Sequence, residues 1–145
     1  MLDFVLAEGL QPLKGIEKLV DIRRLKSFTT EKKSQKKCII YRETYEFEEG
    51  ELKNLAKLGG AVFFSFSDII KQKGFQRGIT ISKMRIASQM CKKTGCGAVF
   101  GTLAQNQMML RNEKELEALM RVLGMTPHEI EFSKKLASKL IGEVK

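Results

Sequence analysis

A single histidine, His128, is the scarcest reactive side chain in this sequence, and its scarcity restricts the chemistry available to the protein. A serine or cysteine nucleophile needs a base within hydrogen-bonding distance, and histidine is the side chain that ordinarily serves near neutral pH. His128 follows Thr126 and Pro127 at the expected start of a helix, where a first-turn residue faces solvent. We therefore predict no catalytic residue.

Cysteine is also scarce, and its pattern fits neither a disulfide framework nor a metal site. The three cysteines, Cys38, Cys91 and Cys96, are odd in number, which is typical of a reducing compartment where thiols pack as small apolar groups. Cys91 and Cys96 have no further Cys or His cluster to complete four zinc ligands. We predict structural cysteines and no metal.

Four further signatures are missing. No Gly-x-x-x-x-Gly-Lys-Ser/Thr loop occurs, and Gly95-Cys-Gly97 lacks the third glycine and the following helix of a dinucleotide fingerprint, so no cofactor is expected. No uncharged run is long enough to cross a bilayer, and the amino terminus lacks the basic start and apolar centre of a secretory signal. These patterns predict a cytoplasmic protein without a membrane partner.

What the sequence has in excess is positive charge, with 26 Lys and Arg against 17 Asp and Glu and a net charge of +9. Such a field attracts polyanions, and nucleic acid is favoured because no expected helix pairs aromatic anchors with a lysine-rich face. Charge is densest at residues 23–37, which we expect to form a surface loop or flexible arm. A solvated charge run is the alternative to a phosphate-contacting arm, but Glu31 is the segment's one acid, which favours RNA contacts by Arg23, Arg24, Lys32, Lys33, Lys36 and Lys37.

The chain is long enough for one domain, residues 1–145, organised around residues 59–125. Short apolar runs at 61–66 and 97–103 are typical of strands buried on both faces, and residues 79–94 between them form an amphipathic pattern with a basic outer side. A strand, a crossover helix and a second strand predict parallel pairing. Asn112 is placed to cap a further helix that ends at Gly124.

The rest of the chain continues the alternation of strands and helices. We expect strands at residues 2–7 and 38–47, helices at 12–25 and 48–58, and a polar loop at 68–78. A last helix at 127–142 begins with Thr126 and Glu129 in the spacing of a capping box. The predicted fold class is α/β, built from parallel βα units.

Three short motifs resemble a known family. Residues 77–82 read Arg-Gly-Ile-Thr-Ile-Ser, residues 110–116 read Leu-Arg-Asn-Glu-Lys-Glu-Leu, and residues 122–127 read Val-Leu-Gly-Met-Thr-Pro. In this order they resemble the carboxy-terminal half of ribonuclease P protein component 3 of archaea and eukaryotes, although the family's Leu-Arg turn usually carries a proline that is absent here. That family has a TIM-like (β/α) barrel, and a regular one needs about 250 residues. The resemblance therefore implies a reduced or incomplete barrel with an open sheet edge.

The resemblance also implies a function. Component 3 binds and stabilises the catalytic RNA that removes the 5′ leader of precursor tRNA, so the implied partners are ribonuclease P RNA, precursor tRNA indirectly, and other protein subunits, especially component 2. Arg77 and Arg111 would lie near the carboxyl ends of parallel strands and contact phosphate, with Lys83 and Arg85 extending the same patch.

Three alternatives stay open at this point. Arg111 could instead pair with Glu115 across one helical turn. The chain could be a general nucleic-acid-binding α/β domain unrelated to tRNA processing. It could also be a reduced metal-dependent phosphoesterase of the same barrel superfamily, using Asp3 with Glu8 or Asp68 as a carboxylate pair.

Overall fold

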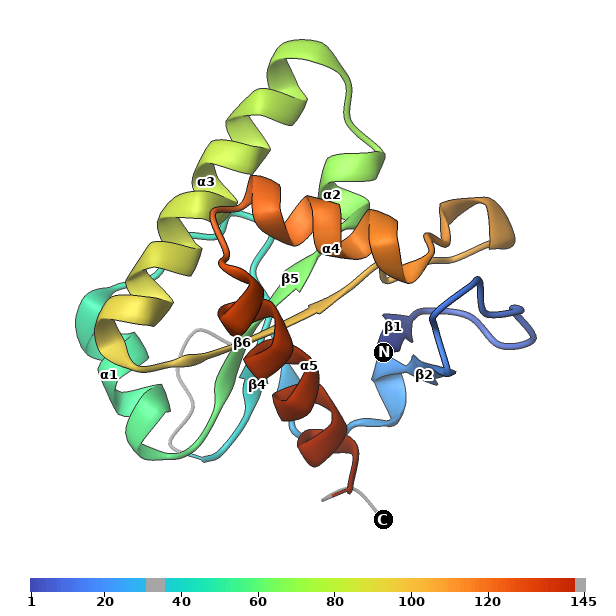
Figure 1. The fold of residues 1–145 in the computed structure, drawn as a ribbon. Coiled ribbons are helices and arrows are strands. Elements are labelled where there is room, and N and C mark those ends of the chain that lie inside the picture. Colours follow the sequence, from blue (N-terminus) through green and yellow to red (C-terminus); the bar gives the residue numbers. More distant parts are fainter. Residues whose placement is uncertain (31–35, 143–145) are drawn as a thin grey trace.

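The computed structural model describes residues 1–30 and 36–142, which form parallel strands flanked by helices (Figure 1). The strands are β1 (Leu2–Val5), β2 (Lys18–Asp21), β3 (Phe28–Thr29), β4 (Ile39–Ile40), β5 (Ala61–Ser65) and β6 (Gly97–Gly101). The helices are α1 (Glu49–Lys57), α2 (Ser67–Ile70), α3 (Gly74–Thr94), α4 (Glu113–Val122) and α5 (Pro127–Gly142), with 3-10 turns η1 (Ile22–Arg24) and η2 (Gln107–Met109). In these residues no helix is long and apolar enough to cross a membrane.

All strand pairings in the described chain are parallel, as predicted from the alternation of strands and helices. One sheet has the order β3-β4-β5-β6 and the other pairs β1 with β2. The two sheets meet where β1 runs beside the continuation of β6: Leu103 N–H donates to Phe4 O at 2.8 Å, and Leu6 N–H donates to Ala104 O at 2.9 Å. No pairing joins β2 to β3 within the described residues, so the α/β fold class is confirmed while a closed TIM-like barrel is not shown.

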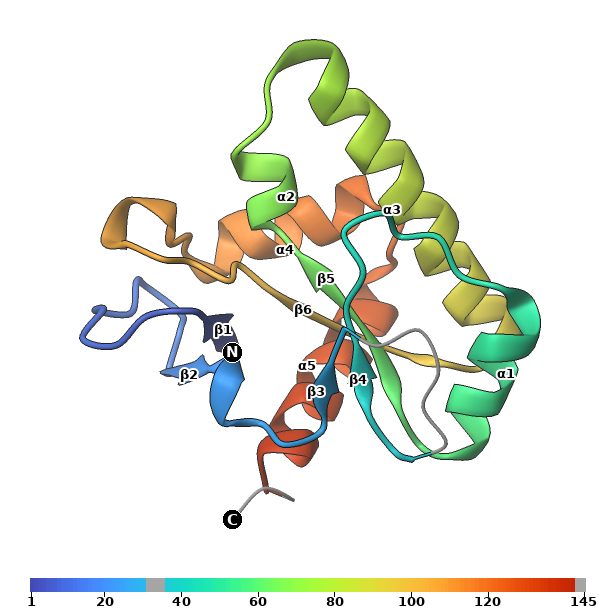
Figure 2. The same cartoon turned by 180° about the vertical axis from the view of Figure 1, so that it is seen from behind.

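The strands curl around one side chain, Phe63 of β5. Its ring lies edge-on to Phe4 of β1 at 5.7 Å, to Phe28 of β3 at 5.8 Å and to Tyr41, just after β4, at 6.1 Å between centroids. Since β1 and β3 lie on opposite sides of β5 in the strand order, the sheet must bend for both to reach the same ring (Figure 2).

Helices cover the opposite face of the four-stranded sheet. Phe64 of β5 stacks on Phe100 of β6 at 4.8 Å, and both belong to a core cluster with Leu52 of α1, Met84 of α3 and Leu116 of α4. Helix α5 crosses β6, where the hydroxyl of Ser133 donates to Ala98 O at 2.8 Å (Figure 1). Its later residues Ala137 and Leu140 belong to the other cluster, with Phe63, so α5 spans both cores.

The two predicted helix starts near the carboxyl end of the chain are confirmed. Asn112 accepts a hydrogen bond from Glu115 N–H at 2.9 Å while the Glu115 carboxylate accepts from Asn112 N–H at 3.1 Å, which is a complete capping box. Thr126 and Glu129 exchange the same two bonds at the start of α5. Acids in these first turns also complement the helix dipole.

The predicted helix at residues 12–25 is wrong. Gly15 has φ of +84°, outside the helical range, and residues 18–21 form β2 instead. Leu19 and Val20 satisfy helical spacing, but pairing with Asp3 and Phe4 of β1 gives their backbone its hydrogen bonds. Tertiary pairing overrides the local pattern here.

The predicted basic arm at 23–37 and the strand at 38–47 need correction too. Residues 22–24 form η1, and Phe28 lies in β3 against Phe63, because strand pairing and ring contacts order a segment whose charge suggested a flexible arm. Residues 31–35 fall outside the described part of the chain. Strand β4 stops at Ile40, and Tyr45 turns the backbone with φ of +53°.

The polar loop expected at residues 68–78 is largely helical. Ser67–Ile70 form α2, and α3 begins at Gly74, earlier than predicted. Arg77 stabilises this arrangement by donating from Nε to Ile69 O at 3.0 Å, at the end of α2. The amino-acid composition of this segment does not indicate that the Arg77 side chain would bond to the backbone of Ile69.

Asp3 fastens β1 to the end of β6 from inside the protein. It is fully buried, and its two carboxylate oxygens accept hydrogen bonds from Thr102 N–H and the Thr102 hydroxyl, both at 2.7 Å. Burial raises the pKa of Asp3 to about 6, although the bonds from Thr102 oppose the shift. The ionised carboxylate therefore costs stability that the protonated form does not.

Because of this cost, the difference in unfolding free energy between the natural protein and Asp3→Asn should depend on pH. The folded-state pKa lies above the unfolded value, so the favourable contribution of Asp3 is complete below about pH 4 and is lost as the pH rises through about 6. Between pH 4 and 7, urea denaturation should show the natural protein losing roughly 2.5 kcal/mol relative to Asp3→Asn. The exposed Glu43→Gln is the control, and parallel pH profiles for the natural protein and Asp3→Asn would contradict the assignment.

Candidate nucleic-acid interface at the carboxyl ends of β5 and β6

Arg77 and Arg111, two of the residues expected to contact RNA, line the same pocket of about 360 Å³. Arg77 lies in the first turn of α3, beyond β5 and α2, and Arg111 lies between η2 and α4, beyond β6 (Figure 1). Because β5 and β6 are parallel neighbours, the segments that follow them emerge at the same edge of the sheet. The other lining residues are Ile69, Ile70, Glu115, Ala118, Leu119 and Val122.

Backbone carbonyls hold both guanidinium groups in place. Arg77 donates from Nε to Ile69 O at 3.0 Å and from Nη2 to Ile70 O at 3.4 Å. Arg111 donates from Nη1 to Met108 O at 2.9 Å and to Leu110 O at 2.8 Å. A guanidinium has five N–H donors, so each arginine keeps donors for a ligand after these bonds are made.

No carboxylate neutralises either arginine in the part of the chain that the structure describes. Glu115 lines the same pocket, but its carboxylate accepts from Asn112 N–H in the capping box and makes no ion pair with Arg111. The pairing of Arg111 with Glu115 across one helical turn is therefore not formed. Two rigidly held cations remain beside one pocket.

Large apolar side chains are exposed two residues before Arg77 and three residues before Arg111 in the sequence. Phe75 is 82% exposed in the first turn of α3, and Met108 is 88% exposed in η2. Arg111 contacts the backbone of Met108 directly. Exposed apolar groups beside cations are a combination that single-stranded nucleic acid can use, through bases and phosphates respectively.

The other expected RNA contacts do not gather at this pocket. Lys83 lines a different pocket, between α3 and the segment with Tyr45 and Phe47, and Arg85 is exposed elsewhere on α3. The guanidinium of Arg23 makes a two-pronged pair with Asp21, with Nη2 2.6 Å from Oδ2 and Nε 2.9 Å from Oδ1.

The remaining basic residues of the predicted arm differ in setting. Arg24 pairs with Glu8 at 3.0 Å, so it is neutralised as Arg23 is. Lys36 and Lys37 are exposed just before β4. Lys32 and Lys33 lie outside the described residues.

A partly buried polar cluster at the same strand ends was not predicted from the sequence. The Asp68 carboxylate accepts hydrogen bonds from the hydroxyls of Tyr41 at 2.8 Å and Tyr45 at 2.7 Å, and the Tyr45 oxygen accepts from Ser65 N–H at 3.0 Å. Burial, together with the charge of Asp68, raises the pKa of both phenols far above the usual value. The contacts join residues distant in sequence, and no local signal marks them.

The carboxylates considered for a phosphoesterase site have separate partners. Asp3 is bonded to Thr102, Glu8 to Arg24 and Asp68 to two tyrosines. Among residues 1–30 and 36–142, no group of three or more His, Cys, Asp or Glu side chains is arranged to hold a metal ion.

Neither protein-family models nor curated proteins match this chain. The resemblance to component 3 stays a prediction that rests on residues 77–82, 110–116 and 122–127.

Tyr45→Phe should destabilise the protein more than Tyr41→Phe. Removing the Tyr45 hydroxyl takes a donor from Asp68 and an acceptor from the buried Ser65 N–H, which should cost about 1–3 kcal/mol. The half-buried Tyr41 hydroxyl is closer to solvent, so water can replace its bond to Asp68 and the cost should be about 1 kcal/mol or less. Urea denaturation of both variants measures the difference, and equal losses would argue against the buried role of Tyr45.

Proposed function

We propose that this protein is an RNA-binding subunit of a ribonuclease P-type ribonucleoprotein, similar to component 3, that holds the catalytic RNA in its active shape. The observation that carries the proposal is the meeting of Arg77 and Arg111 at one pocket. The motifs that resemble the family single out these two arginines, and they come from segments that follow different strands.

The charge state of the pocket supports phosphate binding. Arginine presents planar, permanently charged donors that match phosphate oxygens, and fixed carbonyl partners reduce the entropy lost when the side chain binds. The net charge of +9 adds a long-range attraction for RNA. Phosphate contacts of this kind reduce repulsion between RNA segments and release counterions.

The exposed apolar residues Phe75 and Met108, two and three positions before the arginines in the sequence, favour an unpaired RNA segment. Unstacked bases of loops and bulges stack on aromatic side chains, and Phe75 is the exposed ring nearest to Arg77 in the sequence. In this proposal the RNA performs cleavage of the 5′ leader in the cytoplasm. The protein contacts precursor tRNA only through that RNA, and component 2 is its expected protein partner.

The same arginines also suit a general nucleic-acid-binding domain, because phosphate contacts carry no sequence information. The two candidates differ in selectivity. A ribonuclease P subunit should bind ribonuclease P RNA more tightly than an unrelated RNA of the same length at every salt concentration. Equal affinities with identical salt slopes would favour the general binder.

Arg77→Ala and Arg111→Ala should each weaken binding to ribonuclease P RNA by about 1–3 kcal/mol and reduce the salt slope by roughly one. Lys139→Ala removes the same charge from an exposed position on α5, away from the pocket, and is the matched control. Filter binding across a salt series gives both quantities.

Reconstituted cleavage of precursor tRNA, with RNA plus the remaining subunits, tests the functional consequence. Arg77→Ala and Arg111→Ala should lower the rate at limiting protein, while Lys139→Ala should not. Comparable rates for all three variants would count against the site.

A further inference from the structure

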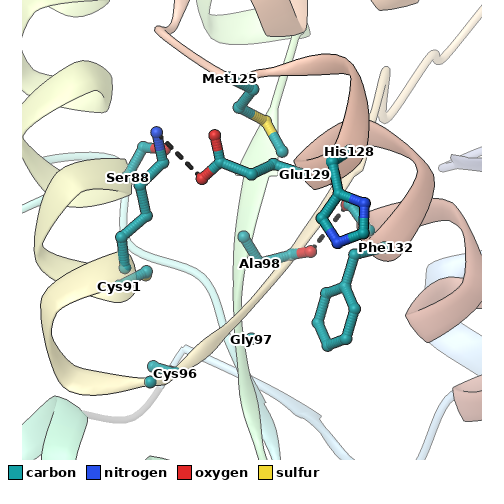
Figure 3. A pocket seen from close by; sticks show the side chains of 12 residues that line it. Ser88, Cys91, Cys96, Gly97, Ala98, Met125, His128, Glu129 and Phe132 are labelled. Atoms are coloured by element: carbon teal, nitrogen blue, oxygen red, sulfur yellow. Dashed lines mark hydrogen bonds and ion pairs between the residues drawn. The ribbon is translucent and has the colours of Figure 1, made fainter.

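A second pocket, of about 310 Å³, lies where the end of α3, the start of β6 and the first turns of α5 meet (Figure 3). Cys91 and Cys96 form part of its wall, and His128 and Phe132 of α5 stand across from them. Nothing in the proposed RNA function uses this pocket. It contains two of the protein's three thiols, while Cys38 is buried elsewhere.

The way α3 ends brings these thiols together. Gly95 follows the helix in the left-handed conformation, with φ of +75°, and Cys96 N–H donates to Cys91 O at 3.0 Å. This is the hydrogen bond of a Schellman motif, and both cysteines belong to one core cluster. Standard bond lengths then hold the two Cα atoms within about 7 Å, inside the range of roughly 4–7 Å found across disulfides.

The two thiols have different acidities because they share a hydrogen bond. The bond from the Cys91 thiol, with a further bond from the backbone of Val62, lowers the pKa of Cys96 although burial opposes it. The same shared bond, together with burial, raises the pKa of Cys91. Cys96 is therefore the better nucleophile of the pair, and Cys91 is the neighbouring thiol that stays protonated.

Both cysteines contribute to the pocket wall, so a small reagent in the pocket lies next to them. Cys91 is 2% and Cys96 is 7% exposed, so bulky reagents are excluded. A pocket of about 310 Å³ is far larger than the space that one water molecule needs, and hydrogen peroxide is only slightly larger than water. The Glu129 carboxylate also lines the pocket, but it pairs with Lys92 at 3.0 Å and so is not free to bond a thiol (Figure 3).

We propose that Cys91 and Cys96 are a peroxide-sensitive dithiol that closes to an internal disulfide. In the first step the Cys96 thiolate attacks one peroxide oxygen, the O–O bond breaks, and a proton completes the released water, leaving a sulfenic acid. In the second step the Cys91 sulfur displaces the hydroxyl group from Cys96 as a second water. Overall, two thiols and one hydrogen peroxide give one disulfide and two waters.

The disulfide would tie the end of α3 to the start of β6. Arg77 lies in the first turn of the same helix, at its opposite end, so oxidation need not disturb the RNA pocket directly. The proposal is therefore independent of the proposed RNA function.

A peptide map of the natural, full-length protein tests the dithiol directly. The reduced protein is exposed to hydrogen peroxide while folded, then denatured, alkylated with N-ethylmaleimide, digested with trypsin and analysed by mass spectrometry. Lys92 and Lys93 lie between the two cysteines, so trypsin separates reduced Cys91 from Cys96 but leaves their peptides joined when a disulfide has formed. We expect the joined peptides, with a loss of two hydrogens, and alkylated Cys38.

Two variants assign the order of the steps. Cys91→Ala should leave a sulfenic acid on Cys96 that dimedone traps, and Cys96→Ala should show no trapped sulfenic acid on Cys91. Cys38→Ser is the control and should still give the joined peptides. Alkylated Cys91 and Cys96 after peroxide, or a disulfide that includes Cys38 or a second chain, would overturn the proposal.

Discussion

The fold depends on the curl of its parallel strands around Phe63. This ring contacts both Phe4 of β1 and Phe28 of β3, and the hydrogen bonds that Thr102 donates to Asp3 hold β1 against the end of β6. Parallel strands send all their following segments to one edge of the sheet. The positions of Arg77 and Arg111 beside one pocket follow from the parallel pairing of β5 with β6.

Local chemistry made much of the fold predictable. The capping residues Asn112 and Thr126 act through bonds that span three residues. Apolar runs such as 61–66 indicate a strand without knowledge of the partner strand. Residues 12–25 could not be assigned in this way, because their spacing also fits a helix. Only the pairing of β2 with β1 and the left-handed Gly15 decide against it.

In the candidate site, too, local features were predictable from the sequence and tertiary contacts were not. Arg77 and Arg111 were recognisable from short motifs, whereas their meeting depends on the parallel pairing of β5 with β6. The ion pair that neutralises Arg23 could have been predicted from the sequence, since its partner Asp21 is only two residues away. The hydrogen bonds that Tyr41 and Tyr45 donate to Asp68 could not be predicted from the sequence, because they form between segments that only the folded sheet brings together.

The central claim is that Arg77 and Arg111 act on one RNA segment through one pocket. A double-mutant cycle tests it most directly, with RNA-binding free energies measured for the natural protein, Arg77→Ala, Arg111→Ala and the double variant at one salt concentration. If both side chains hold neighbouring phosphates, the losses should be non-additive, with a coupling energy above about 0.5 kcal/mol. Losses that add within about 0.3 kcal/mol would contradict a shared site.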